Sequence, residues 1–546
     1  MQKEGWGTRV GLVLAMAGNA VGLGNFLRFP AQAVQNGGGA FIIPYLVSFI
    51  LMGVPLLWIE WAIGRHGGKY GHHSTPGMLD VLGKSKWWKY VGVFGIFTNL
   101  TVAAYYCYTE SWTLAYVWHS VTGAFAGKSA QEVSNFFNDY VGMTGSFFNF
   151  PPEALFFFLF TLGVNTWILS RGLAKGIEIA SKIGMPLLIL FGIFLAIRSL
   201  TLDAGEQGAV NDATLGLNFL WEPQFDSLTN PKVWLAAAGQ IFFTLSVGMG
   251  SIHCYAAYVK ENEDIALNAA SAGWMNEFVE VVLGGSIVVP IAAAYLGLEW
   301  IQNPGNVGLA MGFRVMPTLF QNWGPMLAAL AGIAWFGLLF FAGITSSLAM
   351  GQPVLAFLQD EYKLERTRAA RIWGVLILVL GLWTVFFYGY GAHTEFDDWS
   401  GTFALVVFAM FEAIAFAYVF GIDRGWEEIN RGADIRIPDA FKFVIKYITP
   451  VFLVSVFLGT LISPLNGNWN EAFTSLFSGN GWPLDGGSII GKIFHVGVAD
   501  SRWFVDGAPT PVFIVDLTRT LLLVTFIVIA LVIRNAWKLR AQQSAS

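Results

Sequence analysis

The sequence has little charge for its length. Asp, Glu, Lys and Arg make up only 12% of the 546 residues, whereas 55% are hydrophobic and the mean hydropathy is +0.57. A soluble domain carries about twice that fraction of charge. The composition therefore predicts an integral membrane protein. The net charge of −5 offers no basic surface for nucleic acid, so nucleic-acid binding is not expected.

Cysteine and histidine are also scarce. Cys107 and Cys254 are the two cysteines, and both fall in apolar segments, which argues against a disulfide framework. The seven histidines lie mostly in polar segments and form no cluster of transition-metal ligands. No catalytic histidine or carboxylate pair stands near an expected membrane surface, so an enzyme is not predicted. The N-terminal region shows no cleavable signal pattern.

Apolar windows of about 20 residues predict the membrane spans. Twelve are expected in an all-α protein, beginning near residues 9, 39, 88, 153, 178, 234, 268, 325, 370, 399, 446 and 514. Most of the 31 basic residues then fall on one side, which places both termini in the cytoplasm of a plasma membrane, the inner membrane in a bacterium. The long segment 465–513 reads as either an ordered external cap or a flexible insert.

Residues 18–25 read GNAVGLGN inside the first expected span. Gly22 and Gly24 disfavour a helix where no water can satisfy a broken one, and Asn19 and Asn25 add polar groups at the same depth. Such a segment is tolerated only where it lines a cavity inside the protein. The pattern predicts a broken helix whose freed backbone groups bind an ion and a polar ligand.

A second double-glycine interruption, VGMGS at 247–251, lies in the sixth expected span. The two interruptions are five spans apart, and an odd offset inverts the second unit relative to the first. Paired interrupted spans indicate an inverted-repeat transporter with its site at the repeat interface. Polar side chains also cluster in spans 3, 7 and 8. Carbonyl, hydroxyl and amide oxygens suit a hard monovalent cation such as Na⁺.

Several motifs resemble the neurotransmitter:sodium symporter family, particularly its bacterial leucine-transporting members. They lie at residues 6–30, 36–41, 60–64, 105–112, 240–246, 342–347 and 426–432. The resemblance implies the leucine-transporter fold, a 5+5 inverted repeat with broken helices 1 and 6. The single transporter domain 1–546 would then comprise repeats 8–200 and 233–421, followed by helices 11 and 12 in 444–538.

The resemblance implies two sodium sites. The first would use the Ala20 carbonyl with Asn25, Thr244 and Asn276, and the substrate carboxylate would complete it. The second would use five oxygen ligands. These are the carbonyls of Gly18, Val21 and Ala342 and the hydroxyls of Thr345 and Ser346.

The resemblance also implies a pocket for an amino acid. Its residues would be Ala20, Gly22, Leu23, Gly24, Val102, Tyr106, Phe243, Thr244, Ser246, Met249, Ser346 and Met350. Gly22 leaves room for a carboxylate, where monoamine carriers of the family have Asp. Met249 and Met350 stand where the bacterial leucine transporter has Phe and Ile. Because methionine is flexible, these side chains favour hydrophobic amino acids of several shapes.

Other positions are implied to control ion use and access. Glu280 would replace chloride, so chloride-independent transport is expected, with proton antiport left open. Arg28 and Asp397 would close the outer path, with Asp398 as an alternative partner. Lys3 and Asp360 would close the inner path, supported by Trp6 and Tyr258.

The expected function is sodium-coupled import of a hydrophobic α-amino acid by alternating access. The alternatives are an amino-acid sensor without transport activity and a channel on the same fold. The expected partners are sodium, the amino acid and the lipid bilayer. A homodimer remains open.

Overall fold

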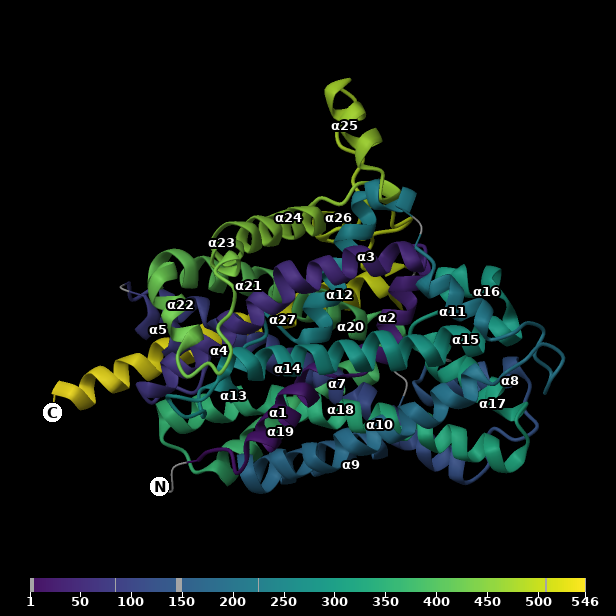
Figure 1. Ribbon diagram of the computed structural model, residues 1–546, viewed down its shortest axis with the longest axis horizontal. Helices are drawn as coiled ribbons and strands as arrows, with labels where there is room; N and C mark the ends of the chain where they lie inside the picture. The colour runs from purple at the N-terminus through teal and green to yellow at the C-terminus, as the bar shows by residue number, and fades with distance from the viewer. Residues whose placement is uncertain (1–3, 84, 144–149, 224, 506–507, 546) are drawn as a thin grey trace.

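The computed structural model describes residues 4–83, 85–143, 150–223, 225–505 and 508–545. These residues form a bundle of long, mostly antiparallel helices (Figure 1). The first half of the bundle contains α1 (Arg9–Ala20), α2 (Gly24–Gln35), α3 (Gly39–Ser48), α4 (Val54–Lys69), α6 (Trp88–Val91), α7 (Val93–Val121), α9 (Pro152–Ser170) and α10 (Glu178–Leu200).

The second half contains the remaining helices of the bundle, both long and short. They are α12 (Pro231–Leu245), α13 (Ser251–Ala256), α14 (Ile265–Glu277), α15 (Gly285–Leu296), α18 (Pro325–Tyr362), α19 (Arg366–Phe386), α20 (Ala392–Phe396), α21 (Leu405–Ile414), α22 (Ile422–Asn430), α23 (Ala440–Phe443), α24 (Thr449–Leu461) and α27 (Pro511–Ala545). Widened π-helical turns adjoin several helices of both halves. They are η1 (Phe49–Gly53), η2 (Leu173–Ile177), η4 (Phe278–Gly284), η8 (Asp397–Ala404), η9 (Ala415–Gly421) and η10 (Val444–Ile448).

Shorter elements lie outside the spans. They are α5 (Thr75–Leu82), α8 (Ala130–Tyr140), α11 (Thr214–Trp221), η3 (Phe225–Thr229), α16 (Leu298–Gln302), η5 (Pro304–Asn306), η6 (Met311–Val315), α17 (Met316–Gln321), η7 (Tyr388–Tyr390), η11 (Leu465–Gly467), α25 (Trp469–Phe477), α26 (Ile489–Ile493), β1 (Phe504–Val505) and β2 (Ala508–Pro509). The two strands pair antiparallel. Both ends of the chain lie at the same end of the bundle, opposite α8, α16 and α17 (Figure 1).

In the described residues, ten helices are long and apolar enough to cross a membrane. An eleventh span results if α1 and α2, which meet at 46°, count as one broken crossing. The expected span near residue 234 is present as α12 followed by α13, but each piece is short. The break in the first span is therefore present, whereas the count of twelve spans and the 5+5 repeat stay predictions.

The described part of the segment 465–513, which leaves out residues 506–507, contains regular structure. It contains α25, α26 and the β1–β2 hairpin, and Pro464 bridges to Leu484 across it. α25 projects from the bundle beside the end of α24, while α26 lies against the bundle (Figure 1). The described residues of this segment are therefore folded, and its role as an external cap stays a prediction.

Candidate functional site

The first break lies between α1 and α2. Val21 has an extended conformation, with φ −70° and ψ 106°, and α2 restarts at Gly24. The Asn25 side chain closes the break, because its Oδ1 accepts a hydrogen bond from the Gly22 amide at 2.7 Å. No residue from 21 to 24 has a positive φ. The glycines here provide space, since a Cβ on Gly22 would lie 2.7 Å from the Tyr106 hydroxyl oxygen.

The second break lies between α12 and α13. Ser246, Gly248 and Gly250 have φ of 54°, 73° and 94°, in the left-handed region that favours glycine. The Gly248 amide donates to Glu60 Oε1 at 2.6 Å, so a buried carboxylate from α4 satisfies this break. The Met249 carbonyl accepts from two side chains of α7, Asn99 and Thr98.

The two breaks meet around one small cavity. Asn25 and every residue of the predicted substrate pocket except Leu23 line it. The lining is Ala20, Gly22, Gly24, Asn25, Val102, Tyr106, Phe243, Thr244, Ser246, Met249, Ser346 and Met350. Leu23 is adjacent, because its amide donates to the Tyr106 hydroxyl at 3.0 Å. The Ser246 hydroxyl joins the breaks by donating to the Asn19 carbonyl at 3.0 Å.

The residues of the first predicted sodium site lie together beside this cavity. Asn25 Nδ2 is 3.1 Å from Thr244 Oγ1 and 2.9 Å from Asn276 Oδ1. All three side chains are buried. The set offers neutral oxygens at the first break.

The residues of the second predicted sodium site also converge. Ser346 Oγ lies 3.2 Å from the carbonyl oxygens of both Gly18 and Val21. Thr345 Oγ1 lies 2.9 Å from the Phe341 carbonyl and 3.2 Å from that of Ala342. These buried neutral oxygens are the ligand type that a hard monovalent cation takes.

Glu280 is enclosed by hydrogen-bond donors. Its carboxylate accepts from Tyr45 at 2.8 Å and from Gln240 at 3.0 Å, and also from the Thr244 hydroxyl. The structure thus connects Glu280 directly to a residue of the first predicted sodium site. The sequence analysis identified Glu280 but gave no role to Tyr45. Tyr45 lies in an apolar run, so a hydrogen bond from its hydroxyl group was not expected.

The predicted outer gate is only partly assembled. The Arg28 guanidinium lies 4.2 Å from the centre of the Phe243 ring, and among the described residues no ion pair joins Arg28 to Asp397. Asp397 instead accepts from the Tyr105 hydroxyl at 2.6 Å. Asp398 forms an ion pair with Lys492 from the 465–513 segment.

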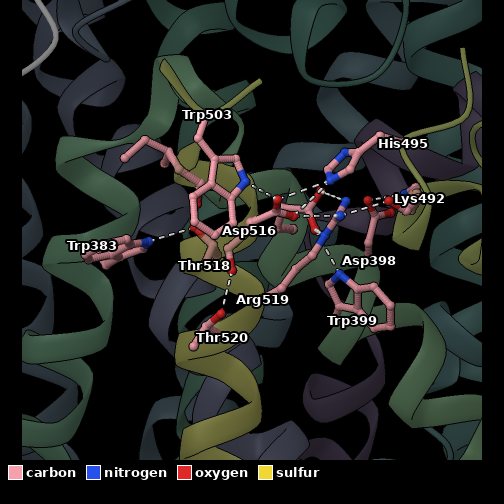
Figure 2. A network of polar contacts seen from close by, with 12 residues as sticks. Trp383, Asp398, Trp399, Lys492, His495, Trp503, Asp516, Thr518, Arg519 and Thr520 are labelled. Carbon is pink, nitrogen blue, oxygen red and sulfur yellow. Dashed lines mark hydrogen bonds and ion pairs between the residues drawn. The ribbon is translucent and has the colours of Figure 1, made fainter. Parts of the chain in front are cut away.

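Figure 2 shows how this segment is attached. Lys492 reaches Asp398, while His495 and Trp503 converge on Asp516 near the start of α27. Arg519 continues the network to Glu395, with 2.7 Å between Nε and Oε2. Sequence reasoning missed these contacts, because Lys492 lies in a segment where the family resemblance fades.

At the opposite end, Lys3 lies outside the described residues. Its predicted partner Asp360 accepts from the His73 amide at 2.7 Å. Tyr258 stacks on the His73 ring, and Trp6 Nε1 donates to the Tyr255 carbonyl at 3.0 Å. Trp6, Tyr258 and Asp360 all line a wide cavity at this end of the bundle.

Three further buried groups, Glu60, His253 and Glu412, meet beside the second break. Glu60 begins one of the motifs of the family resemblance, at residues 60–64, whereas the sequence analysis gave no role to His253 or Glu412. The available signal was an ionisable side chain inside an apolar span, which marks a functional site by default.

The comparisons with known proteins agree with this architecture. The model of the Sodium:neurotransmitter symporter family matches residues 3–143 and 125–490. An uncharacterized sodium-dependent transporter of Methanocaldococcus jannaschii is 29% identical over 462 residues, covering 84% of this chain and 90% of the relative. The sodium-dependent nutrient amino acid transporter 1 of Drosophila melanogaster is 25% identical and covers 85% and 78%.

Among solved structures, the crystal structure of MhsT in complex with L-phenylalanine matches with a TM-score of 0.72 and 30% identity. The match covers 83% of this chain and 99% of that one. The family model covers far more than half of the sequence. The chain therefore belongs to the sodium:neurotransmitter symporter family and is a sodium-dependent, multi-pass membrane transporter.

Proposed function

We propose that the protein imports a hydrophobic α-amino acid together with sodium by alternating access. The observation that carries this proposal is the cavity between the two breaks. On one side Gly22 has no side chain, and the Tyr106 hydroxyl and the start of α2 face the space that a carboxylate would fill. The first amides of a helix favour a negative group.

The first sodium site would link the ion to the substrate. Ala20, Asn25, Thr244 and Asn276 supply its oxygens, and their convergence at the cavity supports the assignment. A substrate carboxylate added to the same shell makes each ligand raise the affinity for the other, because coupling between sites is reciprocal.

The second sodium site would hold α1 against α18. In this structure hydroxyls of α18 satisfy carbonyls on both sides: Ser346 those of Gly18 and Val21, and Thr345 that of Ala342. A bound cation would take the same five oxygens. The ion would then stabilise the packing of the first break on α18.

Side-chain selectivity would come from Met249 and Met350. Both line the cavity, and thioether side chains adapt to differently shaped apolar groups. The structural relative was solved with L-phenylalanine, which supports an apolar substrate. Competition by the twenty amino acids should rank Leu, Met, Phe and Trp first, and preference for Gly, Pro or a charged amino acid would overturn this specificity.

Transport would not need chloride, because the Glu280 carboxylate already receives the donors of Tyr45, Gln240 and Thr244. A proton leaving Glu280 on each cycle would make proton antiport part of the mechanism. Uptake should persist when chloride is replaced by gluconate. A collapse of uptake in gluconate would contradict this role.

Access would alternate between the two ends. Arg28 and Phe243 cover the cavity on the side of Asp397, whereas Trp6, Tyr258 and Asp360 lie at the end that holds both termini. That end would face the cytoplasm of a bacterial inner membrane. A transport-inactive sensor or a channel would keep the binding cavity without coupled flux.

The decisive experiment is uptake of labelled amino acid into proteoliposomes with and without a sodium gradient, alongside binding to purified protein. We expect sodium-dependent uptake and binding, both strongly reduced in Asn25→Ala and Thr345→Ala. Gly163→Ala is a matched control, because its new Cβ meets nothing within 4 Å. Binding without uptake would favour a sensor, and flux that does not saturate would favour a channel.

A further inference from the structure

Three ionisable side chains meet in the apolar interior beside the second break. His253 on α13 lies between Glu60 on α4 and Glu412 on α21, and each side chain is no more than 1% exposed. Nδ1 is 3.2 Å from Glu60 Oε2, and Nε2 is 3.2 Å from Glu412 Oε2. The cluster thus joins three spans at one point.

The charges of Glu60, His253 and Glu412 must be compensated within the cluster. Apart from the two 3.2 Å ion-pair contacts, both His253 nitrogens, Glu60 Oε2 and both Glu412 oxygens have no hydrogen-bond partner among the described residues. A buried carboxylate without a counter-charge is costly in a low-dielectric interior. Compensation must therefore come from within the cluster.

Other ionisable groups on the neighbouring helices have partners of their own. Arg65 and Lys69 pair with Glu428, His66 packs on Tyr70 and Phe420, Arg9 lies beside Glu263, Asp360 accepts from His73, Glu361 pairs with Arg540, Glu110 accepts from Asn165, and Tyr105 donates to Asp397. Among the described residues, the charges that face His253 are therefore those of Glu60 and Glu412.

A proton fits this arrangement better than a metal ion. An imidazolium has N–H donors on both nitrogens, one for each carboxylate, whereas a neutral ring has only one. One ligand atom from each of the three side chains lies within 4.8 Å of the others, so a metal ion is the competing occupant. The two carboxylates lie beside different nitrogens of the ring, however, which is the arrangement that the two N–H groups of an imidazolium require. We propose that Glu60, His253 and Glu412 form a proton-binding site.

The site is connected to the substrate cavity through a single carboxylate. Glu60 Oε1 accepts from the Gly248 amide at 2.6 Å, and Ser246 and Met249 on either side of Gly248 line the cavity. Loss of the proton leaves two negative carboxylates facing each other across a neutral ring. Their repulsion weakens the hold of Glu60 on Gly248 and changes the shape of the second break.

This role is separate from that of Glu280, and only its link to ligand affinity rests on the proposed function. The direct test is nitrogen NMR of the purified full chain with ¹⁵N-labelled histidine. The His253 signal is identified by its loss in His253→Gln. We expect it to be an imidazolium signal at pH 8, where an isolated histidine is mostly neutral. A neutral His253 at pH 6 to 8 would overturn the proposal, whether or not the protein transports anything.

The second test measures sodium-dependent binding of L-phenylalanine at pH 6 and pH 9. We expect the affinity ratio between the two pH values to be at least about tenfold in the wild type, which is about 1.4 kcal/mol. The ratio should fall below about twofold in His253→Gln and in Glu412→Gln. His66→Gln, on the same helix as Glu60, should behave as the wild type.

An unchanged pH dependence in both cluster variants would refute the link between the proton and the break. If His253→Gln does not fold, Glu412→Gln carries both measurements, since it retains the histidine. Stoichiometric metal in the purified wild type that is lost in Glu412→Gln would replace the proton by a metal ion and overturn the assignment.

Discussion

The two helix breaks look alike in sequence but are built in different ways. At the first break the glycines give room to neighbouring side chains, and Asn25 of the same segment satisfies the backbone. At the second break Gly248 and Gly250 supply a left-handed backbone, and Glu60 from another span satisfies it. Glycine therefore provides space for neighbouring side chains at the first break and a left-handed backbone conformation at the second.

The two breaks also differ in the side chains that donate hydrogen bonds to their backbone carbonyl groups. Side chains of α7 satisfy the Met249 carbonyl at the second break, one of them a fixed amide, Asn99. At the first break the hydroxyl of Ser346 satisfies the carbonyls of Gly18 and Val21. A hydroxyl can turn and become an ion ligand itself, whereas an amide N–H cannot. The Ser346 hydroxyl is accordingly one of the predicted cation ligands.

The largest effect should come from Gly248→Ala. The change places a side chain at φ 73° and a Cβ 2.3 Å from the Leu405 carbonyl oxygen. We expect a loss of roughly 3 kcal/mol in the free energy of unfolding, because backbone strain and overpacking add. The measurement is thermal unfolding in detergent.

Gly239→Ala in α12 is the control, since its Cβ would meet nothing within 4 Å and alanine favours the helix. Equal stability of Gly248→Ala and Gly239→Ala would contradict the claim that the second break needs glycine for its left-handed backbone.

Gly22→Ala should leave the fold intact and damage binding. The new Cβ would lie 2.7 Å from the Tyr106 hydroxyl and 3.1 Å from Ser346 Oγ, in the space assigned to the carboxylate. We expect amino-acid affinity to fall about 100-fold, or about 2.7 kcal/mol, with a smaller change in thermal stability. Isothermal calorimetry in sodium measures it. Wild-type affinity in this variant would show that the carboxylate binds elsewhere.

Asn99→Ala tests the fixed amide at the second break. The Met249 carbonyl loses a 2.6 Å hydrogen bond, so we expect a loss of about 1 to 2 kcal/mol in stability with unchanged sodium dependence. Thr345→Ala should instead change the sodium dependence with little loss of stability, because among the described residues its hydroxyl bonds only to carbonyls of its own helix. Thermal unfolding at a series of sodium concentrations measures both the stability and its sodium dependence. The same change in both variants would contradict the proposed difference between the two breaks.

The smallest effect is expected at Ser246, which belongs to both breaks. Ser246→Gly relieves a positive φ but loses the hydrogen bond to the Asn19 carbonyl, so the net change should stay within about 1 kcal/mol. Ser246→Ala loses the bond and keeps the strain, and should be less stable than Ser246→Gly by roughly 1 kcal/mol. If the alanine variant is the more stable, strain at this position is negligible.

The sequence predicted what depends on local composition. Glycine and asparagine inside an apolar run were enough to locate the first break, and the echo at 247–251 located the second. The apolar windows located the long helices. The length of α13 could not be predicted, because the helix ends at Ala256, just before Ala257 and Tyr258 of the wide cavity, rather than at a turn signal.

Contacts between distant residues were beyond the sequence. His253 and Glu412 are separated by 159 positions, and only the packing of α4, α13 and α21 brings them together. Likewise, nothing local in the 465–513 segment indicates that Lys492 pairs with Asp398. The predicted Arg28–Asp397 contact depends on the relative position of the helices that carry the two residues, which motif matching does not give.

Both native thiols are buried, Cys107 in α7 and Cys254 in α13. A cysteine introduced at an exposed position would therefore be the one readily alkylated group on the molecule in this conformation. Water-soluble maleimides could then follow opening at either end in the otherwise unmodified chain. Cys254 gives an internal check, because its own alkylation would report that the packing around α13 had separated.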